Sequence, residues 1–509
     1  MNHRTKTGIS VGAVAAIGAV CGALVVAGSA QAAPVIDTTD LRDAVTVDGV
    51  MAHLNKFQEF ADDNGGTRAA GTPGHVASLE YIEGLLDDAG YDTWRQPFSY
   101  ESVTVLSSSL EQTAPTPTTY VVNEDYVPMD FTGPGDITEP VTAVDINLVG
   151  DRASTSGCED ADFAGFPAGN IALIQRGTCT FGEKADNAAE AGASGVVIFN
   201  QGNGGADRTD LFGGTLGDFA RDIPVVSASF PQGEEWANTA GLELHLAIAT
   251  EVHMVQTENL LADTKTGRVD RTVVVGGHLD SVREGPGIND NGSGTATILE
   301  VALQMADLGI EPENRVRFAF WSGEEDGLIG SSHYVSQLSA RDIKNHALNL
   351  NFDMVGSPNY ANFVYDGDGN AFGTAGPNGS NIIEGVFNDF FASEGQFTEP
   401  TEFDGRSDYF GFIEAGIPAG GLFTGAEGIK TAEEAARYGG TAGVAYDPCY
   451  HQACDDIDNL SSAALDIMSD AVAHSTLTFA ETESAVNGTG KGKAKGTLQL
   501  EFKGDRALR

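Results

Sequence analysis

Basic residues are scarce in this chain of 509 residues, where 28 lysines and arginines stand against 73 aspartates and glutamates. The resulting net charge of −45 argues against nucleic acid as a partner, because proteins that bind nucleic acids neutralise phosphates with lysine and arginine. Acidity of this kind is typical of a solvated surface that keeps a protein soluble. Long apolar runs are also missing after residue 32, so nothing in the rest of the sequence indicates a membrane span.

The first 32 residues have the pattern of a secretory signal peptide. Basic residues precede an apolar run rich in alanine, glycine and valine, and Ala30-Gln31-Ala32 has the small residues of a cleavage site. The alternative is a retained membrane anchor, since residues 9 to 28 are just long enough to span a bilayer, but their many glycines and the cleavage pattern favour a signal. We therefore expect a secreted, extracellular protein with no membrane attachment after removal of residues 1 to 32.

Cysteines are few, and the four that follow the signal fall into two local pairs. Cys158 is followed by Cys179, and Cys449 by Cys454. Four cysteines permit three pairings, and export favours disulfides. We expect the pairing that is local in sequence, because each pair then closes a short loop within one domain. A cysteine zinc site is the weaker interpretation, because the sequence contains no CxxC.

Length and local pattern predict two domains with terminal extensions. Helical periodicity from about residue 47 to 90 predicts two helices, followed by a strand near Thr93, and residues 107 to 119 have the composition of a surface loop or linker. From Leu260 onward strands and helices alternate, which predicts an α/β fold with a mostly parallel twisted sheet flanked by helices. The segment from 481 to 509 is expected to be a flexible or removable tail.

Candidate metal ligands lie at the ends of predicted strands or in late loops. Glu324 and Glu325 end an alternating apolar run, and because adjacent side chains diverge, one can bind a metal while the other carries a proton. Four further candidates occupy comparable positions: His278, Asp290, Asp353 and His451. Ligands in open α/β sheets bind at the carboxyl ends of the strands. Two nitrogen and three carboxylate ligands suit zinc better than magnesium or calcium, so the set predicts a two-zinc hydrolase.

Each of these residues has a plainer interpretation when it is taken alone. Asp290 could cap the helix that follows it, a Glu-Glu pair could form an exposed turn, and His451 could be a surface histidine. Two unpaired carboxylates at the end of a buried strand would be costly, however, so a cation is expected beside the glutamates. Asp280 follows His278 by two residues and is expected to accept the second imidazole N–H, which would orient the ring.

Seven short segments carry a resemblance to a known family: HLDS, GINDNGSG, WSGEEDGLIGS, NFDMVGSPN, DGRSDY, GGLFTGAEG and CYHQACD. In this order they resemble the motifs of secreted bacterial zinc aminopeptidases of the Streptomyces leucine-aminopeptidase type, over residues 45 to 100 and 255 to 480. The resemblance implies a zinc exopeptidase fold and two Zn²⁺ per chain. It also implies that Glu324 is the general base and that the Tyr450 hydroxyl stabilises the tetrahedral intermediate.

The resemblance also implies an allocation of the metal ligands. One zinc would be held by His278 and Glu325, the other by Asp353 and His451, and Asp290 would bridge them. The family's calcium site uses carboxylates that match Asp466 and Asp470 here, and its third ligand is not clearly aligned. Solvated acidic residues are the alternative interpretation of that pair.

Substrate preference follows from the same resemblance. The loop at Gly405 and Arg406, together with Phe423, would line the pocket for the first side chain. Phe423 implies large apolar N-terminal residues such as leucine, phenylalanine or methionine, on peptides or proteins with free N-termini. The alternatives are that Phe423 belongs to the ordinary core and that Arg406 only pairs with a nearby aspartate.

Residues 171 to 200 resemble the core of a protease-associated domain, with the pattern RGxCxFxxKxxxAxxAGAxG. They predict a strand, a disulfide loop, a helix, a glycine turn and a second strand. We place this β-rich domain at residues 130 to 250, which divides the peptidase domain into residues 33 to 129 and 251 to 480. The inserted domain bears on substrate access, because an insert near the cleft could select longer peptides.

Two rival functions remain at this point. A carboxypeptidase of the same fold would need a basic cluster for the substrate carboxylate, and apart from Arg406 the sequence offers little. A binding ectodomain without catalysis would not need the ligands, yet all five and Glu324 are present. We therefore expect a secreted, monomeric zinc aminopeptidase.

Overall fold

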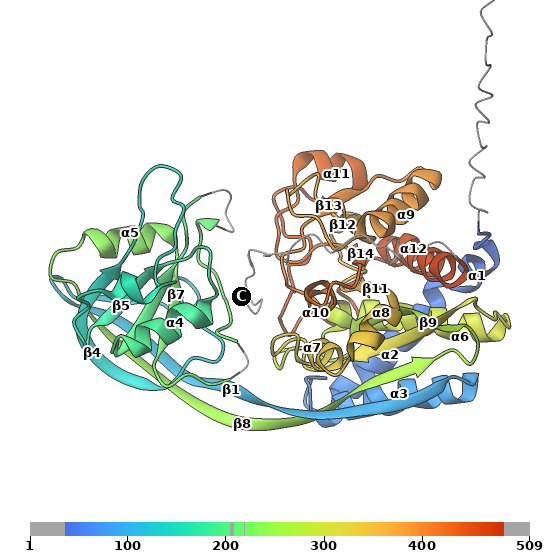
Figure 1. Ribbon diagram of the computed structural model, residues 1–509, viewed down its shortest axis with the longest axis horizontal. Coiled ribbons are helices and arrows are strands. Elements are labelled where there is room, and N and C mark those ends of the chain that lie inside the picture. Colours follow the sequence, from blue (N-terminus) through green and yellow to red (C-terminus); the bar gives the residue numbers. More distant parts are fainter. Residues whose placement is uncertain (1–35, 204–207, 218, 483–509) are drawn as a thin grey trace, which may run out of the picture. The chain divides into compact units, whose positions relative to one another are not determined.

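The computed structural model describes residues 36 to 203, 208 to 217 and 219 to 482 (Figure 1). The expected signal peptide and almost all of the expected C-terminal tail lie outside these residues. Within the described part of the chain, none of the helices combines the length and the hydropathy that a transmembrane span requires.

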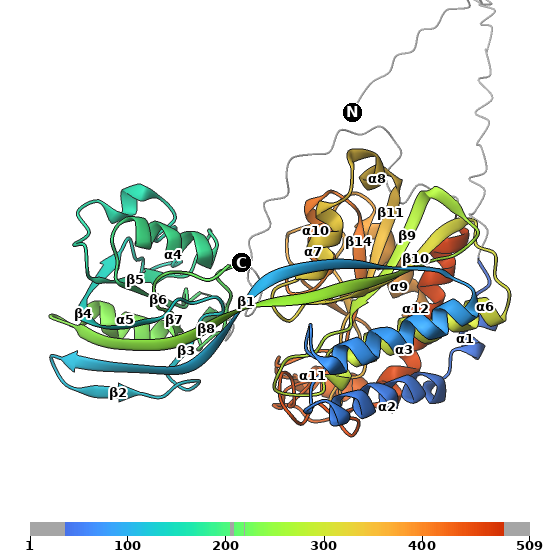
Figure 2. The same cartoon turned by 90° about the horizontal axis from the view of Figure 1, so that it is seen from below.

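The peptidase part is built on a twisted, mostly parallel sheet, as the alternation of strands and helices predicts (Figure 2). Its strand order is β13-β12-β14-β11-β9-β10-β8. The pairs β14/β11, β11/β9 and β9/β10 are parallel, whereas β10/β8 and β12/β14 are antiparallel. The strands run over Glu243–Asp263 (β8), Arg268–His278 (β9), Asn314–Trp321 (β10), His346–Phe352 (β11), Phe363–Tyr365 (β12), Glu399–Thr401 (β13) and Ala419–Phe423 (β14). The carboxyl ends of β9, β10 and β11 therefore meet at one edge.

Helices cover both faces of this sheet (Figure 2). One face carries Val47–Asp63 (α2), Pro73–Ala89 (α3), Gly294–Asp307 (α6), Ser380–Ser393 (α9) and Ser462–Glu481 (α12), with the short Thr39–Ala44 (α1) against α12. The other face carries Ile329–Ser336 (α7), Ala340–Asn345 (α8) and Tyr409–Glu414 (α10). A further helix, Ala432–Tyr438 (α11), lies in the late loops. The strands between the two layers are buried along most of their length, which accounts for their continuous apolar runs.

The two helices predicted near the start of the chain are confirmed, with ordinary end signals. The Thr46 hydroxyl accepts the Gly49 N–H at the start of α2, and Thr72 caps α3 ahead of a proline. Gly90 ends α3 in the left-handed region, at φ 90°, where glycine is favoured.

The predicted loop at residues 107 to 119 is wrong. Strand β1 (Asp92–Ala114) runs through most of it, paired with β8 (Glu243–Asp263), and a short strand β2 (Thr118–Tyr120) pairs with β1. Its serines and threonines lie in a sheet whose partner strand is more than a hundred residues away, and Leu110 is fully buried. Local composition cannot reveal a partner at that distance, which is why the segment resembles a loop.

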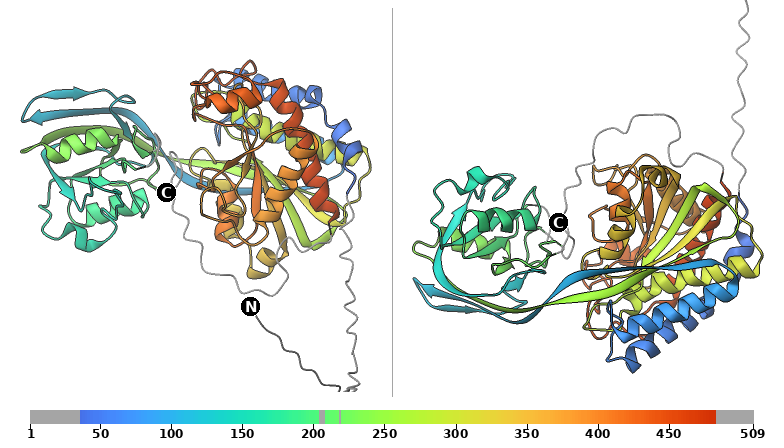
Figure 3. Two further views of the ribbon diagram at one scale, coloured as in Figure 1. Left: turned by 90° about the horizontal axis from the view of Figure 1, so that it is seen from above. Right: turned by 60° about the horizontal axis from the view of Figure 1, so that its bottom comes forward.

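The inserted domain follows the order predicted for its core. Strand β5 (Ile171–Gln175), helix α4 (Phe181–Glu190) and strand β6 (Gly195–Phe199) occur in turn, and Cys158 and Cys179 form a disulfide. The remaining elements are Tyr126–Pro128 (β3), Gly135–Val144 (β4), the 3-10 turn Asp160–Phe163, Val225–Ala228 (β7) and Phe230–Asn238 (α5). Strands β4, β5, β6 and β7 are parallel neighbours (Figure 3).

Alternate residues of the strands in this domain pack on opposite sides of their sheet. Ile174 and Val196 lie in a core with residues of α4, whereas Leu173 and Val197 lie in a core with residues of α5. The two helices therefore cover opposite faces of the sheet. The bounds of this domain at residues 130 and 250 stay a prediction.

Candidate metal centre

The five predicted ligands gather at the carboxyl edge of the sheet. His278 is the last residue of β9, Asp353 directly follows β11, and Glu325 lies just beyond β10. Asp290 comes from the irregular helical segment Ile288–Ser293 that leads into α6, and His451 comes from the loop before α12. The His278 side chain is 1% exposed and those of the other four are at most 12% exposed. Residues up to 173 positions apart in the chain thus share one buried site.

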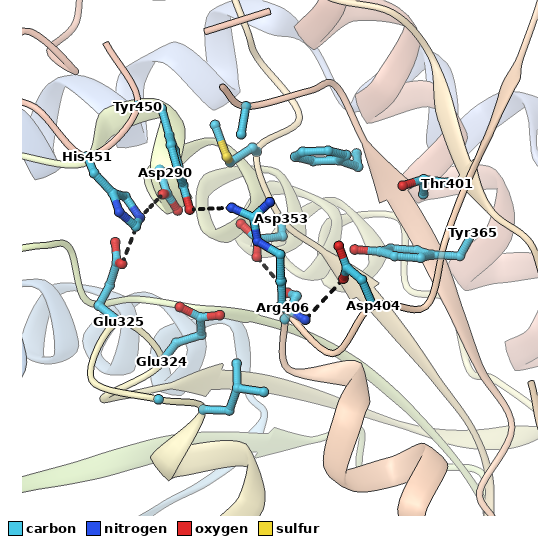
Figure 4. Close-up of a pocket in the computed structure, with 16 residues that line it drawn as sticks. Asp290, Glu324, Glu325, Asp353, Tyr365, Thr401, Asp404, Arg406, Tyr450 and His451 are labelled. Atoms are coloured by element: carbon cyan, nitrogen blue, oxygen red, sulfur yellow. Dashed lines mark hydrogen bonds and ion pairs between the residues drawn. The ribbon is translucent and has the colours of Figure 1, made fainter. Parts of the chain in front are cut away.

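The two oxygens of Asp290 face different histidines, of which Figure 4 shows His451. Asp290 Oδ1 lies 3.3 Å from His278 Nε2, and Asp290 Oδ2 lies 3.1 Å from His451 Nε2. A carboxylate that turns one oxygen to each of two nitrogen ligands has the arrangement needed to bridge two metal ions.

The shortest contacts pair the remaining ligands differently from the allocation that the resemblance implied. His278 Nε2 is 3.3 Å from an Asp353 oxygen, and His451 Nε2 is 3.0 Å from a Glu325 oxygen. The ligand atoms of His278, Asp290 and Glu325 also lie within 4.8 Å of one another. The expected pairs, His278 with Glu325 and Asp353 with His451, are therefore not those that the contacts favour. Strand β9 pairs with both β10 and β11, but Asp353 directly follows β11, whereas Glu325 lies four residues beyond the end of β10.

The electrostatics of the site favour positive charge. Burial by itself would lower the pKa of His278, but the carboxylates of Glu324 and Asp353 raise it well above its ordinary value. Burial likewise opposes protonation of His451, yet Glu325 and Asp290 raise its pKa to about 9. In addition, Glu325 Oε1 is buried without a hydrogen-bond partner among the described residues. Clustered buried carboxylates of this kind call for a cation, and the set of nitrogen and carboxylate donors fits zinc.

Glu324 is close to the ligands but takes a different direction from Glu325. Its Oε2 lies 3.8 Å from His278 Nε2, and its side chain lines the pocket beside the ligands (Figure 4). Burial raises the pKa of Glu324 well above its ordinary value, an effect that His278 partly offsets. A carboxylate with a raised pKa at the edge of a pocket is suited to accept a proton near neutral pH.

Asp280 supports the ligands through two sets of contacts. Its main-chain oxygen lies 3.1 Å from His278 Nδ1, whereas its nearer carboxylate oxygen is 3.9 Å away. The carboxylate instead accepts the backbone N–H groups of Glu324 and Glu325, at 3.3 and 3.4 Å. Asp280 therefore contacts the imidazole through its carbonyl and holds the turn that carries both glutamates.

Tyr450 and Arg406 border the same pocket. Arg406 Nη2 donates to the Tyr450 hydroxyl at 3.2 Å, and Arg406 Nη1 pairs with Glu427 at 2.8 Å. The Tyr450 ring stacks on the His451 ring at 3.8 Å between centroids. Burial raises the pKa of Tyr450 well above its ordinary value, so its hydroxyl stays protonated and can donate a hydrogen bond. The expected alternative that Arg406 pairs only with a nearby aspartate is wrong, because its side chain contacts Glu427 and Tyr450.

The pocket wall opposite the ligands contains residues that the sequence did not single out. Phe423 lines the pocket as expected, together with Tyr365, Thr401 and Asp404. Asp404 Oδ1 accepts hydrogen bonds from the backbone N–H of Arg406 at 3.1 Å and from the Tyr409 hydroxyl at 2.9 Å. Gly405 has φ 83°, in the region that favours glycine, which lets the loop turn beside the pocket. Asp404 could have been found from its place beside Gly405-Arg406, whereas Tyr365 and Thr401 carry no motif.

Two other predicted sites have different outcomes. Cys449 and Cys454 form a disulfide around His451, as expected. Asp466 and Asp470 do not belong to any group of three or more closely spaced ligands in the described chain. Arg42 lies 3.7 Å from Asp470, whose pKa burial raises to about 6. Calcium at this pair stays a prediction.

Comparisons with known proteins identify the family and the inserted domain. The model of peptidase family M28 matches residues 259–476, and the model of the PA domain matches residues 138–236. An aminopeptidase of Pseudomonas aeruginosa is 50% identical over 84% of this chain and 80% of its own length. A probable lipoprotein aminopeptidase of Mycobacterium tuberculosis is 39% identical over 90% of this chain and 91% of its own.

Solved structures give the same result for the fold. An aminopeptidase from an Aneurinibacillus species has a TM-score of 0.69 and 25% identity, with 88% of this chain and 97% of the other covered. A zinc aminopeptidase from Bacillus subtilis has a TM-score of 0.56 and 26% identity, with 87% and 97% covered. With its fold, its ligand set and these relatives taken together, the chain belongs to peptidase family M28 and is a metallo-aminopeptidase with a PA domain inserted in its sequence.

Proposed function

We propose that the protein is a secreted aminopeptidase that uses two zinc ions to remove large apolar residues from the N-termini of peptides and proteins. The observation that carries the proposal is Asp290, whose two oxygens face His278 and His451 separately. In this proposal His278 and Asp353 would hold one ion, His451 and Glu325 would hold the other, and Asp290 would contribute to both.

The chemistry that a zinc pair supplies at such a site is a lowered pKa of bound water and polarisation of a carbonyl group. The chain's own residues do the rest. Glu324 takes the proton from the attacking water and returns it to the leaving amine, a role that its raised pKa supports. The Tyr450 hydroxyl hydrogen-bonds the oxygen on which negative charge develops. Arg406, which donates to that hydroxyl, holds it toward the pocket.

Charge and shape of the pocket support a preference for free N-termini. Carboxylates line one side of the pocket and attract an α-ammonium group. Phe423 and Met354, which also line the pocket, offer apolar surface for the first side chain. Arg406 is already engaged by Glu427 and Tyr450, which leaves it poorly placed to bind the terminal carboxylate that a carboxypeptidase would have to recognise.

Export is part of the proposal. Two disulfides within the described chain suit an oxidising compartment outside the cytosol. Retention at the membrane is the alternative, since the Mycobacterium tuberculosis relative is named a lipoprotein. Detection of the mature protein in the culture medium or in the membrane fraction decides between them.

One assay tests the function. The purified protein is given leucyl, phenylalanyl and lysyl chromogenic substrates, an N-acetylated leucyl substrate, and a peptide with a free carboxyl terminus. We expect hydrolysis of the free aminoacyl substrates with leucine and phenylalanine preferred, loss of activity with a chelator, and recovery with Zn²⁺. Hydrolysis of the N-acetylated substrate, or release of residues from the carboxyl terminus only, contradicts the proposal.

A further inference from the structure

Asp455 holds the backbone of the segment that carries Asp290. Its Oδ1 accepts the N–H of Asn289 and its Oδ2 accepts the N–H of Asp290, each at 2.9 Å. Its main-chain oxygen accepts the N–H of Ile288 at 3.0 Å. Three consecutive residues ending at the bridging carboxylate are therefore bound to one residue. Asp455 is 2% exposed, so these bonds are shielded from water.

The same residue is joined to the loop that carries His451. Asp455 directly follows Cys454, whose disulfide with Cys449 closes the loop around His451. Through this short connection, the position of the His451 backbone and the position of the Asp290 backbone depend on each other.

A network of amides and a second carboxylate holds Asp455 in place. Asn459 Nδ2 donates to Asp455 Oδ1 at 3.1 Å and to Asp447 Oδ1 at 2.9 Å. Asp447 Oδ2 in turn accepts Asn289 Nδ2 at 2.6 Å. The Asp455 carboxylate therefore has little freedom to move, and the segment that it binds shares that rigidity.

We propose that Asp455 is a positioning residue for the metal centre, which couples the bridging ligand Asp290 to the loop of His451 and so sets the spacing of the two ion sites. The inference rests on the metal centre of the proposed function. Asp455 does not contact the site itself and acts through the backbone of Asp290. Charge-assisted hydrogen bonds from two adjacent N–H groups to one carboxylate are stronger and more directional than neutral ones. Residues that orient ligands in this way affect metal affinity by about 10- to 100-fold.

The test replaces Asp455 by asparagine, which keeps the shape of the side chain. The amide NH₂ group then faces one of the two backbone N–H groups, so at least one bond is lost. Asp458→Asn is the matched control, because it makes the same charge change three residues away at an exposed position. Zinc affinity is measured by competition with a chromogenic chelator, and the geometry of the site by the visible absorption spectrum of the Co²⁺-loaded protein.

We expect Asp455→Asn to weaken binding of at least one zinc ion by about 10- to 100-fold and to alter the Co²⁺ spectrum, whereas Asp458→Asn leaves both unchanged. A folded Asp455→Asn protein with unchanged affinity and spectrum overturns the proposal, even if its melting temperature falls, because that pattern indicates a purely structural role. If Asp455→Asn does not fold, Asn459→Ala is measured in the same way, with a smaller loss of affinity expected and an unchanged affinity counting against the proposal.

These measurements separate this inference from the proposed function. Zinc binding that depends on Asp455 in a protein without peptidase activity would refute the function and leave the positioning role intact. If the protein has peptidase activity and Asp455→Asn leaves its zinc affinity unchanged, the positioning role is refuted and the proposed function stands.

Discussion

Glu324 and Glu325 are neighbours in sequence, yet their carboxylates face different groups. Glu325 Oε2 lies 3.0 Å from His451 Nε2, whereas Glu324 Oε2 lies 3.8 Å from His278 Nε2 and lines the pocket. Two adjacent side chains at the end of a strand point in different directions. One of them can therefore bind a metal while the other transfers a proton. The sequence motif alone predicts this division, because it depends only on local geometry.

Replacement of Glu324 by glutamine tests the division. The amide cannot accept the proton of the attacking water, while the ligand set of the site is untouched. We expect kcat to fall by about 10²- to 10⁴-fold with zinc content unchanged, as measured by steady-state kinetics and elemental analysis. Glu311→Gln, at an exposed position, is the control. Turnover close to that of the unmodified protein would show that Glu324 is not the base.

Among the loops, the one closed by Cys449 and Cys454 carries a predicted metal ligand. It contains His451, whose φ of 56° lies in the left-handed region that residues other than glycine rarely adopt. The disulfide restricts the loop to a few conformations before metal binds. The disulfide of the PA domain, Cys158 with Cys179, closes a longer loop and has no ligand within it.

The two disulfides should therefore differ in what their removal changes. Serine replacement of both Cys449 and Cys454, which are five positions apart, should cost about 2 kcal/mol of unfolding free energy, and replacement of Cys158 and Cys179, which are 21 apart, about 3 kcal/mol. We expect the first variant to bind zinc more weakly because His451 is freed, and the second to keep its affinity. Urea unfolding and chelator competition measure the two effects. Equal zinc affinity in both variants would contradict the role given to the loop.

At the scale of the molecule, two histidines of the described residues, His75 and His346, are buried with lowered pKa values. His75 is fully buried, both its ring nitrogens lack hydrogen-bond partners among the described residues, and burial lowers its pKa to about 3. Burial also lowers the pKa of His346 to about 4. Such groups bind protons more readily in the unfolded state, so they favour unfolding as the pH falls below the ordinary histidine range.

Replacement of His75 by leucine isolates one of these contributions. Between pH 7.5 and pH 5 the unfolded chain protonates His75 while the folded chain does not, so the unmodified protein should lose about 2 kcal/mol more than His75→Leu over this interval. Urea unfolding at the two pH values measures the difference, with the partly exposed His253→Gln as control. An equal loss in the variant and the unmodified protein would mean that His75 does not titrate as described.

Much of the fold could be predicted from the sequence because it depends on short-range patterns. The helices α2, α3 and α6 and the strands β9, β10 and β11 follow from periodicity and end signals that lie within each element. The segment at residues 107 to 119 was predicted wrongly as a loop, because its strand is formed by pairing with β8 rather than by its own composition.

The candidate ligands could likewise be predicted from the sequence, because they are histidines and carboxylates at the ends of predicted strands. The pairing of these ligands could not be predicted. Which histidine meets which carboxylate follows from the strand order β11-β9-β10 and from the way the His451 loop returns to the sheet. Asp455 shows the same limit: its residue type gives no sign of the two N–H groups that it accepts, 165 and 166 positions away. Contacts across such separations form only when the chain has folded, and so the arrangement of the centre was decided by tertiary structure while its chemistry was already present in the amino acids.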